Sequence, residues 1–137
     1  MKLAIRILRV LVATLFLYAG VVKLGASERF TITVAQIALL PPAWVAPLAM
    51  VLPWAEMLTG VLMLIPRTAR LGALAAAGLL AVFLTALTWA WTQGLAVDCG
   101  CFGEDATGNV RDQIPVALAR DILLLPLTLL LAARRSY

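Results

Sequence analysis

Four long apolar stretches take up most of this 137-residue chain, at about residues 7–24, 44–65, 71–91 and 114–133. Each is close to the roughly 20 apolar residues that a helix needs to cross the hydrocarbon core of a bilayer. Backbone polar groups find no water inside a bilayer, so a crossing segment must form a helix or part of a closed barrel. We therefore predict an all-α membrane protein, a bundle of four transmembrane helices that forms one domain over residues 1–137 in the lipid bilayer.

The composition excludes several classes of function. Hydrophobic residues make up 64% of the chain, and histidine is absent. The absence of histidine excludes His-ligated haem, a His-bearing zinc site and hydrolysis of the Ser-His type. The net charge is +4, but the basic residues flank the apolar stretches and form no single patch. We therefore expect no nucleic-acid partner.

The first apolar stretch has a basic start, which is also a feature of cleaved signal peptides. Leu24-Gly25-Ala26 is a poor cleavage site, however, and Lys23 interrupts the stretch just before it. We therefore expect the stretch to be retained as a transmembrane span.

Residues 27–42 predict a short helix along the membrane surface, between the first span and the second. Ser27-Glu28-Arg29 resembles a helix start. The apolar residues that follow at helical spacing are Phe30, Val34, Ile37 and Leu40.

The distribution of charge predicts the orientation. With four spans, one side of the membrane carries seven basic residues and no acidic one: Lys2, Arg6, Arg9, Arg67, Arg70, Arg134 and Arg135. The other side carries Lys23, Arg29 and Arg111, with the acidic residues Glu28, Asp98, Glu104, Asp105 and Asp112. By the positive-inside rule both termini are cytoplasmic. The loop over residues 93–112 then faces the periplasm or exterior, from the inner membrane of a bacterial cell.

Both cysteines of the chain, Cys99 and Cys101, lie in that loop. Disulfides persist outside the cytoplasm, and Gly100 gives the backbone between the two thiols the freedom to close a small ring. Such a ring is strained and easily reduced, and it closes too short a loop to stabilise the fold much. We therefore predict a redox-active, catalytic pair. Phe102-Gly103 suggests a structural turn that lays an aromatic ring against the bundle.

Two other uses of the cysteine pair stay open. The disulfide would be structural if it only shaped a tight turn. Two thiolates can also hold copper(I), whereas zinc requires about four ligands. We assign no metal ligand.

Three charged residues, Glu56, Arg120 and Asp121, lie well inside the predicted spans. Charges at that depth are costly, so they should face the bundle interior and pair. The length of Arg120 would let it reach Glu56, and Lys23 could reach down from the outer end of the first span. Neighbouring residues point about 100° apart on a helix, so Asp121 is expected to serve a different neighbour and to be structural.

Two interpretations of these charges stay open. They form an ion pair that sets the helix register, or they form a polar pocket beneath the cysteine loop that handles a quinone or a proton. In the second case Lys23, Glu56 and Arg120 are the candidate cofactor-binding residues.

Four motifs in order resemble those of the MauE/DoxX-like family of small bacterial membrane proteins. They are Leu17-Tyr18-Ala19-Gly20-Val21-Val22-Lys23-Leu24, Leu52-Pro53-Trp54-Ala55-Glu56 followed by Gly60, Asp98-Cys99-Gly100-Cys101-Phe102-Gly103, and Arg120-Asp121. The third is the DCGCFG signature of the MauE branch. Pro53 is a structural candidate, because a proline inside a transmembrane helix usually bends it.

The resemblance implies a four-helix membrane bundle linked to periplasmic thiol chemistry. MauE is thought to aid maturation of the disulfide-rich small subunit of methylamine dehydrogenase beside a thioredoxin-like partner, and DoxX relatives are tied to membrane oxidoreductase complexes. Our hypothesis is a thiol-disulfide component whose Cys99/Cys101 pair exchanges electrons, in either direction, with a periplasmic thioredoxin-like protein. A membrane quinone is the candidate cofactor. The alternatives are a non-enzymatic scaffold or chaperone subunit and copper(I) handling. The sequence makes no prediction of the oligomeric state.

Overall fold

The computed structural model describes residues 1–37, 39–95 and 110–134, with only the backbone for residues 110–113. Over these residues the chain forms helices α1 (Lys2–Gly25), α2 (Ser27–Ile37), α3 (Pro42–Leu64), α4 (Ala69–Thr92) and α5 (Val110–Ala133). Within them, α1, α3, α4 and residues Ile114–Ala133 of α5 are long and apolar enough to cross a membrane. The predictions of four spans and of a short helix after the first are therefore confirmed. The placement of α2 along the membrane surface stays a prediction.

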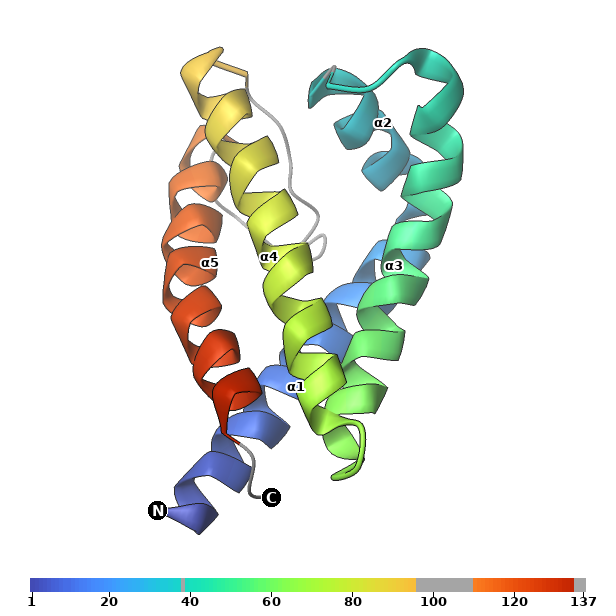
Figure 1. Ribbon diagram of the computed structural model, residues 1–137. Helices are drawn as coiled ribbons and strands as arrows, with labels where there is room; N and C mark the ends of the chain where they lie inside the picture. The colour runs from blue at the N-terminus through green and yellow to red at the C-terminus, as the bar shows by residue number, and fades with distance from the viewer. Residues whose placement is uncertain (38, 96–109, 135–137) are drawn as a thin grey trace.

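The helices run up and down the bundle (Figure 1). Helix α1 packs along α3, α4 packs along α5, and α2 packs against α3. The N-terminal end of α1, the C-terminal end of α5 and the turn between α3 and α4 lie at the lower end of Figure 1. The upper end is formed by α2, the C-terminal end of α4 and the N-terminal end of α5. The first helix thus begins, and the last helix ends, at the same end of the bundle. The placement of both termini in the cytoplasm stays a prediction.

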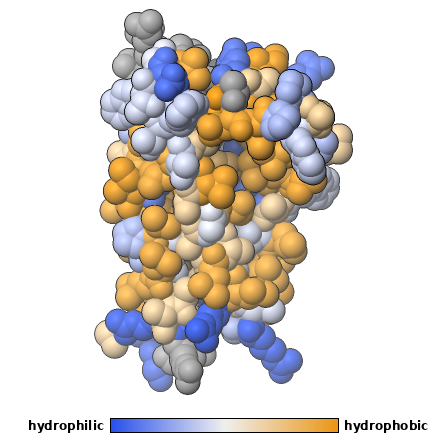
Figure 2. Space-filling model, turned by 45° about the horizontal axis from the view of Figure 1, so that its top comes forward, coloured by the Kyte–Doolittle hydropathy of each residue, from blue (hydrophilic) through white to orange (hydrophobic). Residues whose placement is uncertain are grey.

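The surface has the character of a membrane protein. Figure 2 shows an apolar band around the middle of the molecule, with hydrophilic residues gathered at its two ends. Large apolar side chains such as Leu11, Trp54 and Leu123 are each more than half exposed. Apolar surface of this extent is costly in water but is matched by lipid chains.

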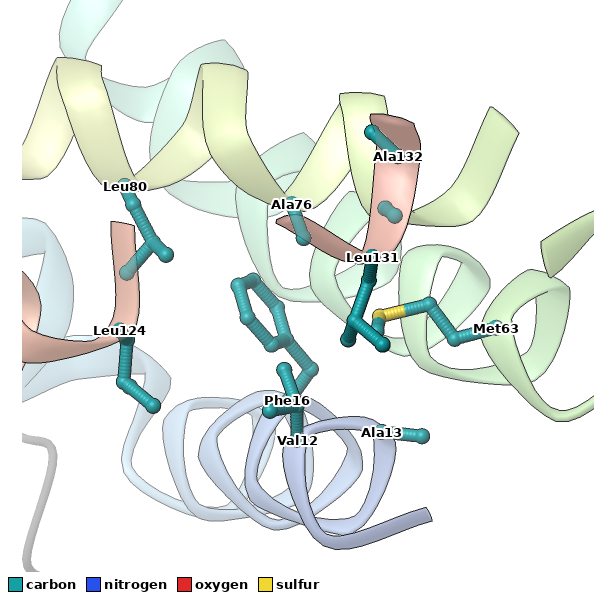
Figure 3. Close-up of a cluster of buried hydrophobic side chains, with 10 residues drawn as sticks. Val12, Ala13, Phe16, Met63, Ala76, Leu80, Leu124, Leu131 and Ala132 are labelled. Atoms are coloured by element: carbon teal, nitrogen blue, oxygen red, sulfur yellow. The ribbon is translucent and has the colours of Figure 1, made fainter. Parts of the chain in front are cut away.

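The larger of two clusters of buried apolar side chains in the described residues lies in the lower half of the bundle, beside the turn between α3 and α4 (Figure 3). There Phe16 of α1 points toward Ala76 of α4, and Leu131 of α5 lies beside Met63 of α3. The small residues of α4 let the other helices approach closely, as expected for helix packing in membranes. The buried members of the cluster are Val12, Ala13, Phe16, Met63, Ala73, Ala76, Leu80, Leu124, Leu131 and Ala132.

Helices α1 and α3 touch through two glycines, Gly20 and Gly60. A Cβ atom on Gly20 would lie 2.5 Å from Met57 Cγ and 2.8 Å from the Pro53 carbonyl oxygen. A Cβ atom on Gly60 would lie 2.9 Å from the Ala13 carbonyl oxygen. These distances are too short for any side chain, so the two helices are in backbone contact. Helix α3 continues through the buried Pro53 without a break.

This contact yields a stability prediction. Gly20→Ala should destabilise the protein by about 1–3 kcal/mol, because the added methyl group has no room against backbone atoms. Thermal unfolding of the detergent-solubilised protein measures the effect. Gly78→Ala is the matched control, since a Cβ atom there meets nothing within 4 Å. Equal unfolding temperatures for the two variants would contradict the close contact.

Candidate functional site

A buried ion pair joins α1 to α3 above the apolar core. Lys23 Nζ donates a hydrogen bond of 2.6 Å to Glu56 Oε1, and both side chains are only 2% exposed. Lys23 follows Gly20 by three residues, and Glu56 follows Pro53 by three, so each charge lies on the same helix face as its contact residue. The glycine contact therefore brings the two charged residues within reach.

Two aromatic rings complete the surroundings of Lys23. Its Nζ atom lies 4.3 Å from the ring centroid of Phe83 on α4 and 5.3 Å from that of Phe30 on α2. Cation–π attraction is strengthened where water is excluded. Three helices, α2, α3 and α4, thus supply groups that stabilise the ammonium group of Lys23 on α1. The sequence offered no signal for Phe83, which looks like any other apolar residue of its span.

A second ion pair lies on α5. Arg120 Nε and Nη2 donate hydrogen bonds of 2.9 and 2.7 Å to Asp121 Oδ1. Asp121 is fully buried, whereas Arg120 is 27% exposed. The neighbour of Asp121 Oδ1 is thus Arg120 itself, a partner that the sequence analysis did not name. Although neighbouring residues point about 100° apart on a helix, the long Arg120 side chain folds back toward its own sequence neighbour.

The two ion pairs form one cluster, which we call the charge cluster (Lys23, Glu56, Arg120 and Asp121). Lys23 adds electrostatic attraction to the Asp121 carboxylate beyond its bond with Glu56. Lys23 and Arg120 also line the same two cavities. The formal charges cancel, which lowers the cost of holding four ionisable groups inside an apolar bundle.

The larger cavity, which we call the upper cavity, has a volume of about 600 Å³. All five helices contribute to its lining, and its polar wall is formed by Lys23, Arg120 and Asp121. The rest is mainly apolar: Phe30, Val34, Ile37, Leu39, Leu40, Leu48, Leu52, Ala81, Val82, Phe83, Ala86 and Leu87. The volume and the mixture of apolar walls with a few charged groups are those of small-molecule sites.

A smaller cavity of about 100 Å³ touches the other side of the charge cluster. Glu56 lines this small cavity together with Lys23 and Arg120, whereas Asp121 lines the upper one. The structure therefore brings the three candidate cofactor-binding residues together, and it adds Asp121 to the larger of the two spaces.

The predicted residues of the cysteine motif, Cys99, Gly100, Cys101, Phe102 and Gly103, lie outside the described residues. Among the residues that the structure does describe, no group of three or more His, Cys, Asp or Glu side chains could hold a metal ion.

These features define a small helical protein with four candidate membrane spans and a buried charge cluster beside an apolar cavity. The chain belongs to the MauE family, because the family profile described as "Methylamine utilisation protein MauE" matches residues 1–134. The chain is 36% identical over 91 residues to the methylamine utilization protein MauE of Methylophilus methylotrophus, covering 66% of this chain and 48% of that protein.

It is also 38% identical over 96 residues to the MauE protein of Paracoccus denitrificans, covering 69% of this chain and 52% of that protein. The chain thus spans about half the length of the curated relatives it matches. No solved structure matches it.

The geometry of the charge cluster predicts how its loss affects stability. Lys23→Met or Glu56→Leu alone should cost about 3–5 kcal/mol, because each leaves an opposite charge buried without this partner. The double variant should cost clearly less than the sum, since it removes both charges. Unfolding of all three variants in detergent measures the coupling. Additive losses would contradict a direct Lys23–Glu56 interaction.

Proposed function

We propose that this protein is a membrane thiol-disulfide redox component. Cys99 and Cys101 exchange electrons with a periplasmic thioredoxin-like protein, and the charge cluster and the upper cavity hold a membrane quinone that takes up or supplies the electrons. Following the names of its relatives, we further propose a role in the maturation of periplasmic proteins for methylamine utilisation.

The upper cavity is the observation that carries this proposal. A quinone has an apolar body and a polar head, and this cavity combines apolar walls with Lys23, Arg120 and Asp121 at one side. Val82 lines the cavity and is 60% exposed, so the cavity is open toward the apolar surface. A lipid-soluble molecule would enter from the bilayer.

The position of the cavity also supports the proposal. Its α2 and Leu39–Leu40 walls belong to the upper end of the bundle, where α4 ends at Thr92 and α5 begins at Val110. The segment with the two cysteines joins these helix ends. A thiol pair in this segment is attached to the chain at the same end of the bundle as the cavity that would hold the quinone.

The proposed step balances in electrons and protons. Oxidation of the Cys99/Cys101 dithiol breaks two S–H bonds, forms one S–S bond and releases two electrons and two protons. The quinone takes up the two electrons and the two protons and becomes a quinol. The disulfide then exchanges with a dithiol of the partner through a mixed disulfide. The same steps run in reverse if the potentials favour reduction of the partner.

Topology labelling tests the orientation. A membrane-impermeant thiol reagent should label Cys99 and Cys101 in intact, reduced cells, because the proposed loop lies outside the cytoplasm. A cysteine placed at the exposed Arg67 at the lower end, in a background with both native cysteines replaced by serine, is the control. It should react only after the cells are permeabilised. The opposite pattern would overturn the proposal.

The thiol chemistry is tested by single substitutions. Cys99→Ser and Cys101→Ser should each abolish turnover of a thioredoxin-like partner. One of them should also accumulate a mixed disulfide, since the resolving thiol is missing. Non-reducing gels and partner turnover measure both effects. If both variants keep full turnover, the pair is structural and a scaffold function is favoured instead.

A further inference from the structure

Asp121 occupies a distinctive position in the wall of the upper cavity. Its side chain is fully buried, and both hydrogen bonds from Arg120 end on Oδ1. The other oxygen, Oδ2, is buried and accepts no hydrogen bond from any residue that the structure describes. A buried carboxylate oxygen without a donor is costly, and most such atoms in native proteins have a partner. In the polar wall of the cavity, Asp121 Oδ2 therefore lacks a hydrogen-bond donor.

The surroundings restrict the molecule that brings this donor. Apart from the charged wall and the hydroxyl groups of Thr33 and Thr85, the cavity lining is apolar. The donor must therefore belong to a molecule with a large apolar body. The exposure of Val82 indicates access from the lipid side. A hydroxyl group on a lipid-soluble ring fits both requirements.

We propose that the upper cavity binds the reduced, hydroxyl-bearing form of a membrane quinone more tightly than the oxidised form, with Asp121 Oδ2 accepting the hydrogen bond of a quinol hydroxyl group. This inference rests on the proposed function and deepens it. The carboxylate of an ion pair only accepts hydrogen bonds, and so does a quinone carbonyl group. At Asp121 Oδ2 a quinone carbonyl group would therefore place two acceptors against each other, whereas a quinol hydroxyl group supplies the missing donor.

Preferential binding of the quinol has a consequence for the electron transfer. By thermodynamic linkage, a ligand form that binds more tightly is favoured at equilibrium. For a two-electron couple, each tenfold preference for the quinol raises the potential of the bound quinone by about 30 mV. The bound quinone thus becomes a stronger oxidant of the Cys99/Cys101 dithiol. Asp121 would favour electron flow from the thiols to the membrane.

The test measures the binding of both redox forms without thiol chemistry. The full chain with Cys99→Ser and Cys101→Ser is kept in detergent without oxygen. Its affinity is measured by titration with a decyl-substituted benzoquinone and, separately, with the corresponding quinol. Since hydrogen bonds to charged groups are stronger than neutral ones, the quinol should bind roughly tenfold or more tightly than the quinone. The dimethyl ether of the quinol keeps the apolar body but has no donor, and it should bind no better than the quinone.

Substitution of Asp121 assigns the effect to this residue. Asp121→Asn should remove the preference for the quinol, because the amide can donate to a quinone carbonyl group as well as accept. Glu28→Gln is the matched control, since Glu28 is exposed on α2 and does not line the cavity. It should keep the preference. If Asp121→Asn does not fold, the affinities of the quinone, the quinol and the dimethyl ether for the protein with Asp121 intact test the proposed preference.

Several outcomes would overturn the inference. They are equal affinity for quinol and quinone, tighter binding of the quinone, full quinol preference in Asp121→Asn, or binding of neither form. None of these results depends on the cysteines. Turnover of a thioredoxin-like partner by the native thiols is measured separately, so failure of the redox preference and failure of the proposed thiol function are distinguishable.

Discussion

The structure depends on placing four charged side chains inside an apolar bundle. A lone charge in such surroundings is costly, and here each charge has an opposite charge beside it: Lys23 with Glu56 at 2.6 Å, and Arg120 with Asp121 at 2.7 Å. The Lys23–Glu56 pair joins α1 to α3, the Arg120–Asp121 pair lies on α5, and the rings of Phe30 and Phe83 bring in α2 and α4. Every helix of the bundle therefore has a residue at or next to the charge cluster.

Packing divides the bundle into two parts. Below the charge cluster, small residues of α4 and the ring of Phe16 fill the interior (Figure 3). Above it, the helices leave the upper cavity of about 600 Å³. The upper half has its own buried apolar cluster, in which Leu87 and Ala90 of α4 pack against residues of α5: Ile114, Ala117 and Leu118. The charge cluster lies at the boundary, and three of its members, Lys23, Arg120 and Asp121, line the upper cavity.

Two of the family motifs have a common physical explanation. Gly20 and Lys23 lie on one face of α1, and Pro53, Glu56 and Gly60 lie on the facing side of α3. The glycines permit backbone contact, and the contact brings the two charges within hydrogen-bonding distance. The first motif and the second are therefore the two halves of one helix interface. The third, around Cys99 and Cys101, lies outside the described residues, and its function is a proposal.

The sequence by itself determined the helical architecture, because about 20 apolar residues in a row leave a membrane chain few alternatives to a helix. It also indicated that Glu56, Arg120 and Asp121 should face the bundle interior and pair, since an unpaired charge inside a membrane span is costly. Only the tertiary structure decided which partners meet. The pair of Lys23 with Glu56, the rings around Lys23 and the shape of the upper cavity all depend on how the helices are rotated against one another. Local sequence does not encode these, because they result from packing between segments far apart in the chain.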